Sequence, residues 1–176
     1  MTCESCVHQV TIQNEDGISL TGKELDFFCP VCFDQHLQVA TLKSSQVCAC
    51  SCCLGFLIDS ISLGSLIGIL RAEYKGADDK PVMMDRTELE SKFNCPACFD
   101  PMYTHPYHGP GNVVLNSCSQ CQLNWLDAGE LSKIVRAPGR RWTPNIFHVA
   151  HDFKLRFSCY KIAKRNQSME THKWRI

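Results

Sequence analysis

Hydrophobic and polar residues follow different patterns along the chain, and two of these patterns predict regular elements directly. In residues 7–20, β-rich segments lie on both sides of Asp16 and Gly17, and this arrangement predicts a hairpin turn. From about Ser60 to Tyr74 the sequence predicts a helix that is apolar on almost every side, with serine and glycine between the aliphatic residues. Such a helix needs cover on a second side, from another part of the chain or from a second copy of it.

The C-terminal part of the chain carries an amphipathic pattern. Between Asn145 and Lys164, apolar residues recur at helical spacing and basic residues lie between them, so the sequence predicts a basic helix. Three interpretations of its apolar face remain open: packing on the rest of the chain, contact with single-stranded nucleic acid through interleaved aromatic rings, and attachment to a membrane surface. The apolar positions are Phe147, Ala150, Phe153, Phe157 and Tyr160.

Two pairs of cysteines indicate a bound metal ion. The pairs are Cys95/Cys98 and Cys118/Cys121, each with two residues between its members, and nineteen residues separate the pairs. A C-x2-C turn places two thiolates on one side of a tight loop, and two such turns complete the tetrahedral four-thiolate shell of structural zinc. Because the intervening length suits one β-hairpin, the sequence predicts a zinc ribbon.

The residues that follow this ribbon predict a helix docked at its end. Asp127 can cap the helix, and Glu130 three residues later can reach back toward it in a capping-box arrangement. Leu131, Ile134 and Val135 then provide a short apolar face.

The two cysteine pairs and the run Trp-Leu-Asp-Ala-Gly-Glu-Leu at 125–131 resemble the small, mostly bacterial zinc-ribbon family named after the ribbon of transcription factor IIB. The resemblance covers one ribbon and its helix. It implies a zinc-binding ribbon with a short helix, and it implies neither a reaction nor a role in transcription initiation.

An earlier segment repeats this pattern. Cys-Pro-Val-Cys-Phe-Asp at 29–34 matches Cys-Pro-Ala-Cys-Phe-Asp at 95–100 nearly residue for residue. A second pair, Cys50 and Cys53, follows, and Asp59 stands where the other copy has its capping Asp, although the Glu of the capping box is missing. The predicted zinc ligands are Cys29, Cys32, Cys50 and Cys53 in the first site and Cys95, Cys98, Cys118 and Cys121 in the second.

Four further cysteines can form a third zinc site made only of cysteine. These are Cys3, Cys6, Cys48 and Cys52. In the alternative interpretation, Cys48 and Cys52 are small buried thiols beside the knuckle. The prediction is therefore two zinc ions, or three with the N-terminal site. Histidines more often satisfy local hydrogen bonds than bind metal here, and the weaker candidate ligands are His8, His36, His105 and His108.

Composition favours metal over disulfides. The chain has 176 residues and 13 cysteines, and its first twenty residues contain no apolar signal-peptide core. We therefore expect a cytoplasmic, reducing location in which thiols stay free to bind metal. Modules of this size bury little apolar surface, so zinc must supply much of their stability.

Charge is divided unevenly along the chain. Residues 1–135 contain 8 Lys and Arg against 16 Asp and Glu, whereas residues 136–176 contain 10 against 2. Each four-thiolate zinc site adds about −2 to the acidic part. The basic segment can therefore bind nucleic acid or the acidic part of its own chain.

These patterns together predict a small, metal-stabilised α+β fold with two tandem zinc ribbons and a C-terminal basic amphipathic helix. The expected order is an N-terminal knuckle and hairpin (1–22), a first ribbon with the apolar helix (23–76), a linker (77–87), a second ribbon (88–137) and the basic segment (138–176).

The predicted function is that of a non-enzymatic scaffold. Four thiolates leave zinc no open position for water, and no other catalytic constellation is present in the sequence. We expect binding of protein or nucleic acid through the basic segment, with homodimerisation through residues 60–74 as a further alternative and with no small-molecule substrate. The rival hypotheses are a thiol-based metal or redox sensor that uses the surplus cysteines, and a membrane-associated adaptor.

Overall fold

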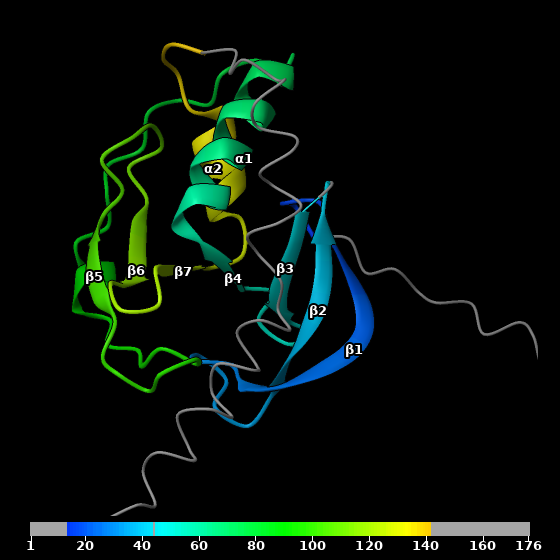
Figure 1. The fold of residues 1–176 in the computed structure, drawn as a ribbon. Coiled ribbons are helices and arrows are strands. Elements are labelled where there is room, and N and C mark those ends of the chain that lie inside the picture. The colour runs from blue at the N-terminus through cyan, green and yellow to red at the C-terminus, as the bar shows by residue number, and fades with distance from the viewer. Residues whose placement is uncertain (1–13, 44, 142–176) are drawn as a thin grey trace, which may run out of the picture.

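Seven antiparallel strands form one sheet, in the order β1-β2-β3-β4-β7-β6-β5 (Figure 1). The computed structural model describes residues 14–43 and 45–141. The strands are β1 (Ile18–Phe28), β2 (His36–Leu42), β3 (Ser45–Cys50), β4 (Phe56–Asp59), β5 (Tyr103–Pro106), β6 (Val114–Cys118) and β7 (Leu123–Leu126).

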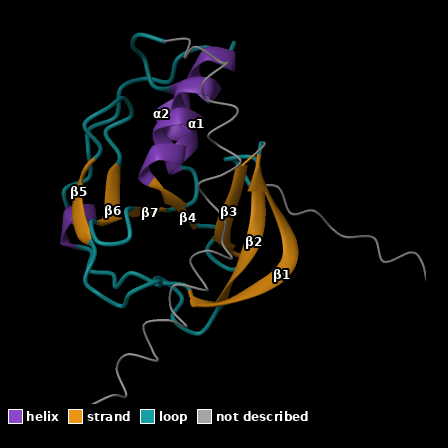
Figure 2. Ribbon diagram, viewed as in Figure 1, coloured by secondary structure: helices purple, strands orange, loops and turns teal. Residues whose placement is uncertain are grey.

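One α-helix follows the last strand of each repeat, and both helices lie on the same side of the sheet (Figure 2). They are α1 (Ser60–Glu73) and α2 (Glu130–Arg136), and a short 3₁₀ helix, η1 (Thr87–Glu90), precedes β5. Asp59 caps α1, since its Oδ1 accepts hydrogen bonds from the backbone N–H groups of Ile61 at 3.1 Å and Ser62 at 2.9 Å. The predicted helix and its cap are confirmed.

The prediction of two tandem zinc ribbons holds only in part, because β4 of the first ribbon pairs with β7 of the second and joins both into one sheet. Leu57 and Trp125, each four residues after the last cysteine of its copy, are direct partners in this pair. On one side of this pair Phe56 pairs with Leu126, and on the other Ile58 pairs with Asn124. Phe56 and Asn124 occupy the same position in their copies, as do Ile58 and Leu126, so the pairing is symmetric about Leu57 and Trp125. The two repeats are therefore related by a local two-fold axis through the Leu57/Trp125 pair.

Alternation of side chains along the central strands produces two buried clusters on opposite faces of the sheet. Phe56 and Ile58 join the helix-face cluster, which α1 and α2 cover, whereas Leu57 joins the knuckle-face cluster. The helix-face cluster also contains Leu63, Leu66, Ile67, Leu115, Leu126, Leu131 and Ile134. The knuckle-face cluster contains Leu25, Phe27, Leu37, Val39, Leu57, Met102, Leu123 and Trp125, together with Cys29, Cys48, Cys50, Cys95 and Cys118.

The cover predicted for the apolar helix comes in part from the second ribbon, because α1 and α2 share the helix-face cluster. On its outer side, Ile61 is 54% exposed. Neither α-helix in the described ranges is long and apolar enough to cross a membrane. The predicted turn is present at Asn14–Gly17, where Gly17 N donates to Asn14 O at 2.9 Å. The strand expected before this turn and the predicted C-terminal helix lie outside the described residues.

Candidate metal centres

The first centre brings together the four cysteines predicted for the first site. Cys29 and Cys32 lie between β1 and β2, whereas Cys50 ends β3 and Cys53 lies between β3 and β4. All four Sγ atoms lie within 4.8 Å of one another. The Sγ atom of Cys29 is 3.6 Å from that of Cys53, and the Sγ atom of Cys50 is 3.9 Å from that of Cys32.

The second centre repeats this arrangement with the four cysteines predicted for the second site. Cys95 and Cys98 precede β5, whereas Cys118 ends β6 and Cys121 lies between β6 and β7. Their Sγ atoms also lie within 4.8 Å of one another, with 3.6 Å between Cys98 and Cys118. Among the described residues, these two cysteine groups are the places where three or more potential metal ligands come together.

The distances fit a tetrahedral zinc ion. Zinc bound to four sulfur atoms at about 2.3 Å has S···S edges of about 3.8 Å, close to the observed separations. A disulfide would need an S–S distance of about 2.05 Å, and none of the ten described cysteines forms one. The donor set and its spacing therefore match a structural zinc shell.

Backbone geometry prepares each knuckle for metal. The residue after the second cysteine of every knuckle adopts a left-handed conformation, with φ between 57° and 64° at Phe33, Leu54, Phe99 and Gln122. This turn directs backbone N–H groups at sulfur: Cys32 N donates to Cys29 Sγ at 3.4 Å, and Cys121 N donates to Cys118 Sγ at 3.3 Å. Hydrogen bonds of this kind stabilise thiolate, which is the form that binds metal.

Electrostatics within each centre also favour a cation. The hydrogen bond from Cys53 lowers the pKa of the Cys29 thiol to about 5, and the same bond, with burial, raises the pKa of Cys53. In the second centre, burial raises the pKa of Cys95, and burial together with the bond to Cys98 raises the pKa of Cys121 to about 12. Four thiolates cannot coexist without a neutralising ion, and a divalent cation would release the remaining protons.

The cysteines of the predicted third site differ in their surroundings. Cys48 lies on β3 and is fully buried in the knuckle-face cluster, whereas Cys52 is exposed in the second knuckle of the first centre. Cys3 and Cys6 lie outside the described residues, so the third site stays a prediction.

The described histidines make local contacts rather than joining either centre. His36 hydrogen-bonds the backbone oxygen of Leu25 through Nδ1 at 2.9 Å, and its ring lies 4.3 Å from that of Phe28. His105 Nε2 lies 2.8 Å from the hydroxyl of Ser117. His108 stacks at 6.4 Å from the ring of His105, and His8 lies outside the described residues.

The helix of the second ribbon begins differently from the prediction. Its N-cap is Gly129, and no side chain of its own turn caps it. The carboxylate of Asp127 instead accepts a hydrogen bond from the Trp125 indole at 2.9 Å. Glu130 does reach back as predicted, since its Oε2 accepts from Asp127 N at 2.8 Å. Glu130 is buried, and burial raises the pKa of its carboxyl to about 8.

Two residues of the first ribbon, which in the fold begins with the Asn14–Gly17 turn before β1, complete this helix. The buried carboxylate of Asp16 accepts from Gly129 N at 2.7 Å and from Ser132 N at 2.8 Å, so it caps α2 from far along the chain. At the other end, the buried guanidinium of Arg71 donates to the carbonyl oxygens of Ile134 at 2.5 Å and Ala137 at 3.0 Å. The second centre is thus held against the first ribbon at both ends of its helix.

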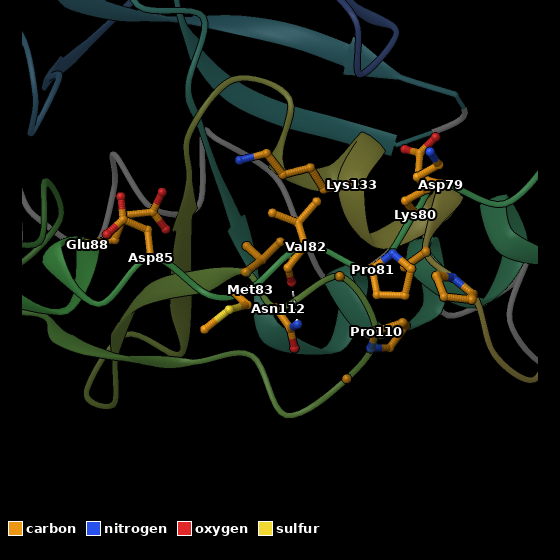
Figure 3. A pocket seen from close by; sticks show the side chains of 15 residues that line it. Asp79, Lys80, Pro81, Val82, Met83, Asp85, Glu88, Pro110, Asn112 and Lys133 are labelled. Atoms are coloured by element: carbon orange, nitrogen blue, oxygen red, sulfur yellow. Dashed lines mark hydrogen bonds between the residues drawn. The ribbon is translucent and has the colours of Figure 1, made fainter.

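A cavity of about 360 Å³ lies beside the end of α2, between the linker and the tip of the second hairpin (Figure 3). Val82 and Met83 form its apolar wall, and the side-chain amide of Asn112 donates to Val82 O at 2.6 Å. Acidic and basic side chains both line it, and none of the described metal-ligating groups opens into it. The cavity is therefore separate from the two metal centres.

No known protein family, curated protein or solved structure matches this chain. The resemblance to the zinc-ribbon family therefore stays a prediction, and the interpretation of the centres depends on their geometry.

Proposed function

We propose that this protein is a non-enzymatic scaffold that binds two structural zinc ions and presents a rigid surface to a protein partner. The observation that carries the proposal is the pair of four-cysteine groups, each drawn from two knuckles of one shared sheet. Four thiolates fill the coordination shell of zinc and leave no position for a reactive water. The metal would therefore hold the fold and take no part in a reaction.

A protein partner suits the charge of the described residues better than nucleic acid does. Residues 14–43 and 45–141 carry 11 Lys and Arg against 15 Asp and Glu, a net charge of −4. Two zinc centres with four thiolates each would add about −4 more. Such a surface repels phosphate groups, so nucleic-acid binding would have to depend on the basic segment that follows.

The test begins with the zinc content of the native protein, measured by atomic emission on chain purified without chelator. We expect two ions per chain, and three if Cys3, Cys6, Cys48 and Cys52 also hold one. A chain that contains no zinc, or whose ligand cysteines are joined in disulfides, would overturn the proposal. If the chain binds single-stranded nucleic acid with high affinity, and this affinity falls steeply with salt, the proposed partner is nucleic acid and not protein.

A second candidate function is supported by the exposed thiol of Cys52. The neighbouring thiol of Cys32, a ligand of the first centre, raises the pKa of Cys52, whereas the second copy has Gln120 at the equivalent position. A peroxide could oxidise Cys52 and Cys32 to a disulfide while it is reduced to water, and this would remove one zinc ligand. The test is zinc release by dilute hydrogen peroxide. A sensor predicts rapid loss of one ion, slowed in Cys52→Gln, while equal rates in both proteins would exclude it.

A further inference from the structure

Two phenylalanines at equivalent positions of the repeats are unusually exposed. Phe33 follows Cys32 and Phe99 follows Cys98, and their side chains are 74% and 67% exposed. Neither ring belongs to either buried cluster. One exposed apolar residue is ordinary in a protein surface, but the same ring exposed at the same place in both repeats requires an explanation.

The backbone at both positions is unfavourable for phenylalanine. The φ angles are 60° at Phe33 and 64° at Phe99, in the left-handed region where glycine or asparagine is the usual residue. The knuckle fixes this conformation, because the N–H of Phe33 donates to Cys29 O at 3.0 Å and that of Phe99 to Cys95 O at 2.8 Å. Each copy therefore carries a side chain that destabilises the turn and gains no burial. Strain of this kind is typical of functional positions.

The charge beside each ring defines what can bind there. An exposed aspartate, Asp34 or Asp100, follows each phenylalanine, and each neighbouring centre would be anionic with zinc bound. The two centres border one knuckle-face cluster, and each ring directly follows a ligand of one centre. A ligand for this surface needs apolar or aromatic groups together with cations.

We propose that the C-terminal segment of this same chain, residues 142–176, docks on the two knuckles. Its sequence has 7 Lys and Arg against 2 Asp and Glu, and its aromatic residues recur at helical spacing among them. Aromatic rings of the segment stack on Phe33 and Phe99, and its cations lie beside Asp34 and Asp100. The surface therefore has a ligand of matching chemistry in its own sequence.

The length of the segment permits this docking. Arg141, the last described residue, is held near the end of α1 by an ion pair with Asp78 and a hydrogen bond to Tyr74 O. An extended chain covers about 3.3 Å per residue, so residues 142–176 can reach on the order of 100 Å from Arg141. The helix that the sequence predicts between Asn145 and Lys164 would span roughly 30 Å.

The experiment is limited trypsin digestion of the full zinc-loaded chain, with the rate of cleavage after Lys154, Arg156 and Lys161 followed by mass spectrometry. We expect slow cleavage in the parent protein and at least tenfold faster cleavage in the double variant Phe33→Asn/Phe99→Asn. Because asparagine tolerates the left-handed conformation, this variant should keep two zinc ions and an equal or higher Tm. Charge reversal by Asp34→Lys/Asp100→Lys provides an independent disruption and should also accelerate cleavage.

The matched control is Met83→Asn, which removes a side chain that is 91% exposed and is located in the linker. Cleavage in this variant should equal that of the parent. Cleavage of the parent as fast as a synthetic 142–176 peptide, or no acceleration in either double variant, would overturn the proposal. Protection that disappears on dilution would also overturn it, in favour of docking by a second copy. The zinc content is measured in the same samples, so a failure of docking is distinguished from a failure of the zinc scaffold.

Discussion

The two ribbons build the same metal centre but complete their helices in different ways. The first ribbon has an α1 of 14 residues, which starts from its own Asp59 cap. The second has an α2 of only 7 residues, which takes its N-terminal cap from Asp16 and its C-terminal partner from Arg71. The copy with the clearest family-like motif is thus the one whose helix depends on the other copy.

This difference explains why the ribbons share one sheet. A seven-residue helix is too short to be stable by itself, and a three-strand remnant without the first ribbon would leave both ends of α2 without partners. The first ribbon supplies the β4 edge, the cap and the arginine. We therefore expect the molecule to fold as one cooperative unit, with the second ribbon as its dependent half.

The largest expected effect comes from loss of a zinc ligand. Cys50→Ser and Cys118→Ser each remove one thiolate, and structural zinc contributes about 10–16 kcal/mol, which is as much as a whole domain. Since both centres border the knuckle-face cluster, we expect each variant to hold fewer than one zinc ion per chain and to lose most of its circular dichroism. Cys52→Ser is the control and should retain two ions. A folded Cys118→Ser chain with one tightly bound ion would show that the first ribbon is independent.

The next effect concerns the C-terminal end of α2. Arg71→Met keeps the apolar stem but leaves the carbonyl groups of Ile134 and Ala137 without their donor. Unsatisfied buried carbonyls cost about 2–4 kcal/mol in total, so chemical denaturation should show a loss of that size. Lys43→Met removes only the exposed ion pair with Glu73 and should change stability by less than about 0.5 kcal/mol. Similar losses in both variants would contradict the role given to Arg71.

Glu130 predicts how stability depends on pH. Its folded-state pKa of about 8 lies above the usual value of a carboxyl, so its contribution to stability is fully present below pH 4.5 and is lost as the pH rises through 8. Glu130→Gln removes this titration while keeping an acceptor for Asp127 N. Relative to the parent, the variant should gain up to about 1.4 kcal/mol per pH unit between pH 6 and 8. Parallel stability curves for the two zinc-loaded proteins would show that Glu130 is ionised in the fold.

The smallest effect tests the cap supplied by the first ribbon. Asp16→Ala removes the acceptor for Gly129 N and Ser132 N and should cost about 1–2 kcal/mol. Hydrogen exchange at Ser132 should accelerate, while exchange in α1 stays unchanged. Asp59→Ala is the matched variant, and in it hydrogen exchange should accelerate in α1 alone. Exchange that accelerates equally in both helices for either variant would contradict separate caps.

The metal centres and the first helix were predictable because their signals are local in sequence. Two residues between cysteines fix a knuckle, the repeat of the 29–34 hexapeptide at 95–100 assigns the pairs, and the aliphatic run after Asp59 defines α1. In each case, chemistry and spacing within a few residues determine the structure.

The joined sheet and the cross-ribbon caps could not be predicted in the same way. Asp16 is 113 residues from Gly129, and no periodic pattern records a contact over that distance. A signal was present in Arg71, which follows a run of uncharged residues in α1 and is buried in the fold. A second signal was an apolar dipeptide at the same position of each repeat, Leu57-Ile58 and Trp125-Leu126. These dipeptides lie in β4 and β7, the two strands that pair.

The two-fold pairing of β4 with β7 has a consequence for synthesis. The first copy leaves the ribosome before the second, and until β7 arrives the Phe56-Leu57-Ile58 edge has no neighbour on that side. The β4–β7 register is symmetric about its central pair. The β4 edge of one nascent chain can therefore pair with the β4 edge of another in the same register. Exchange of strands between chains on the same message is therefore the misassembly that this architecture must avoid, and a truncated chain ending after Glu73 would be its most direct product.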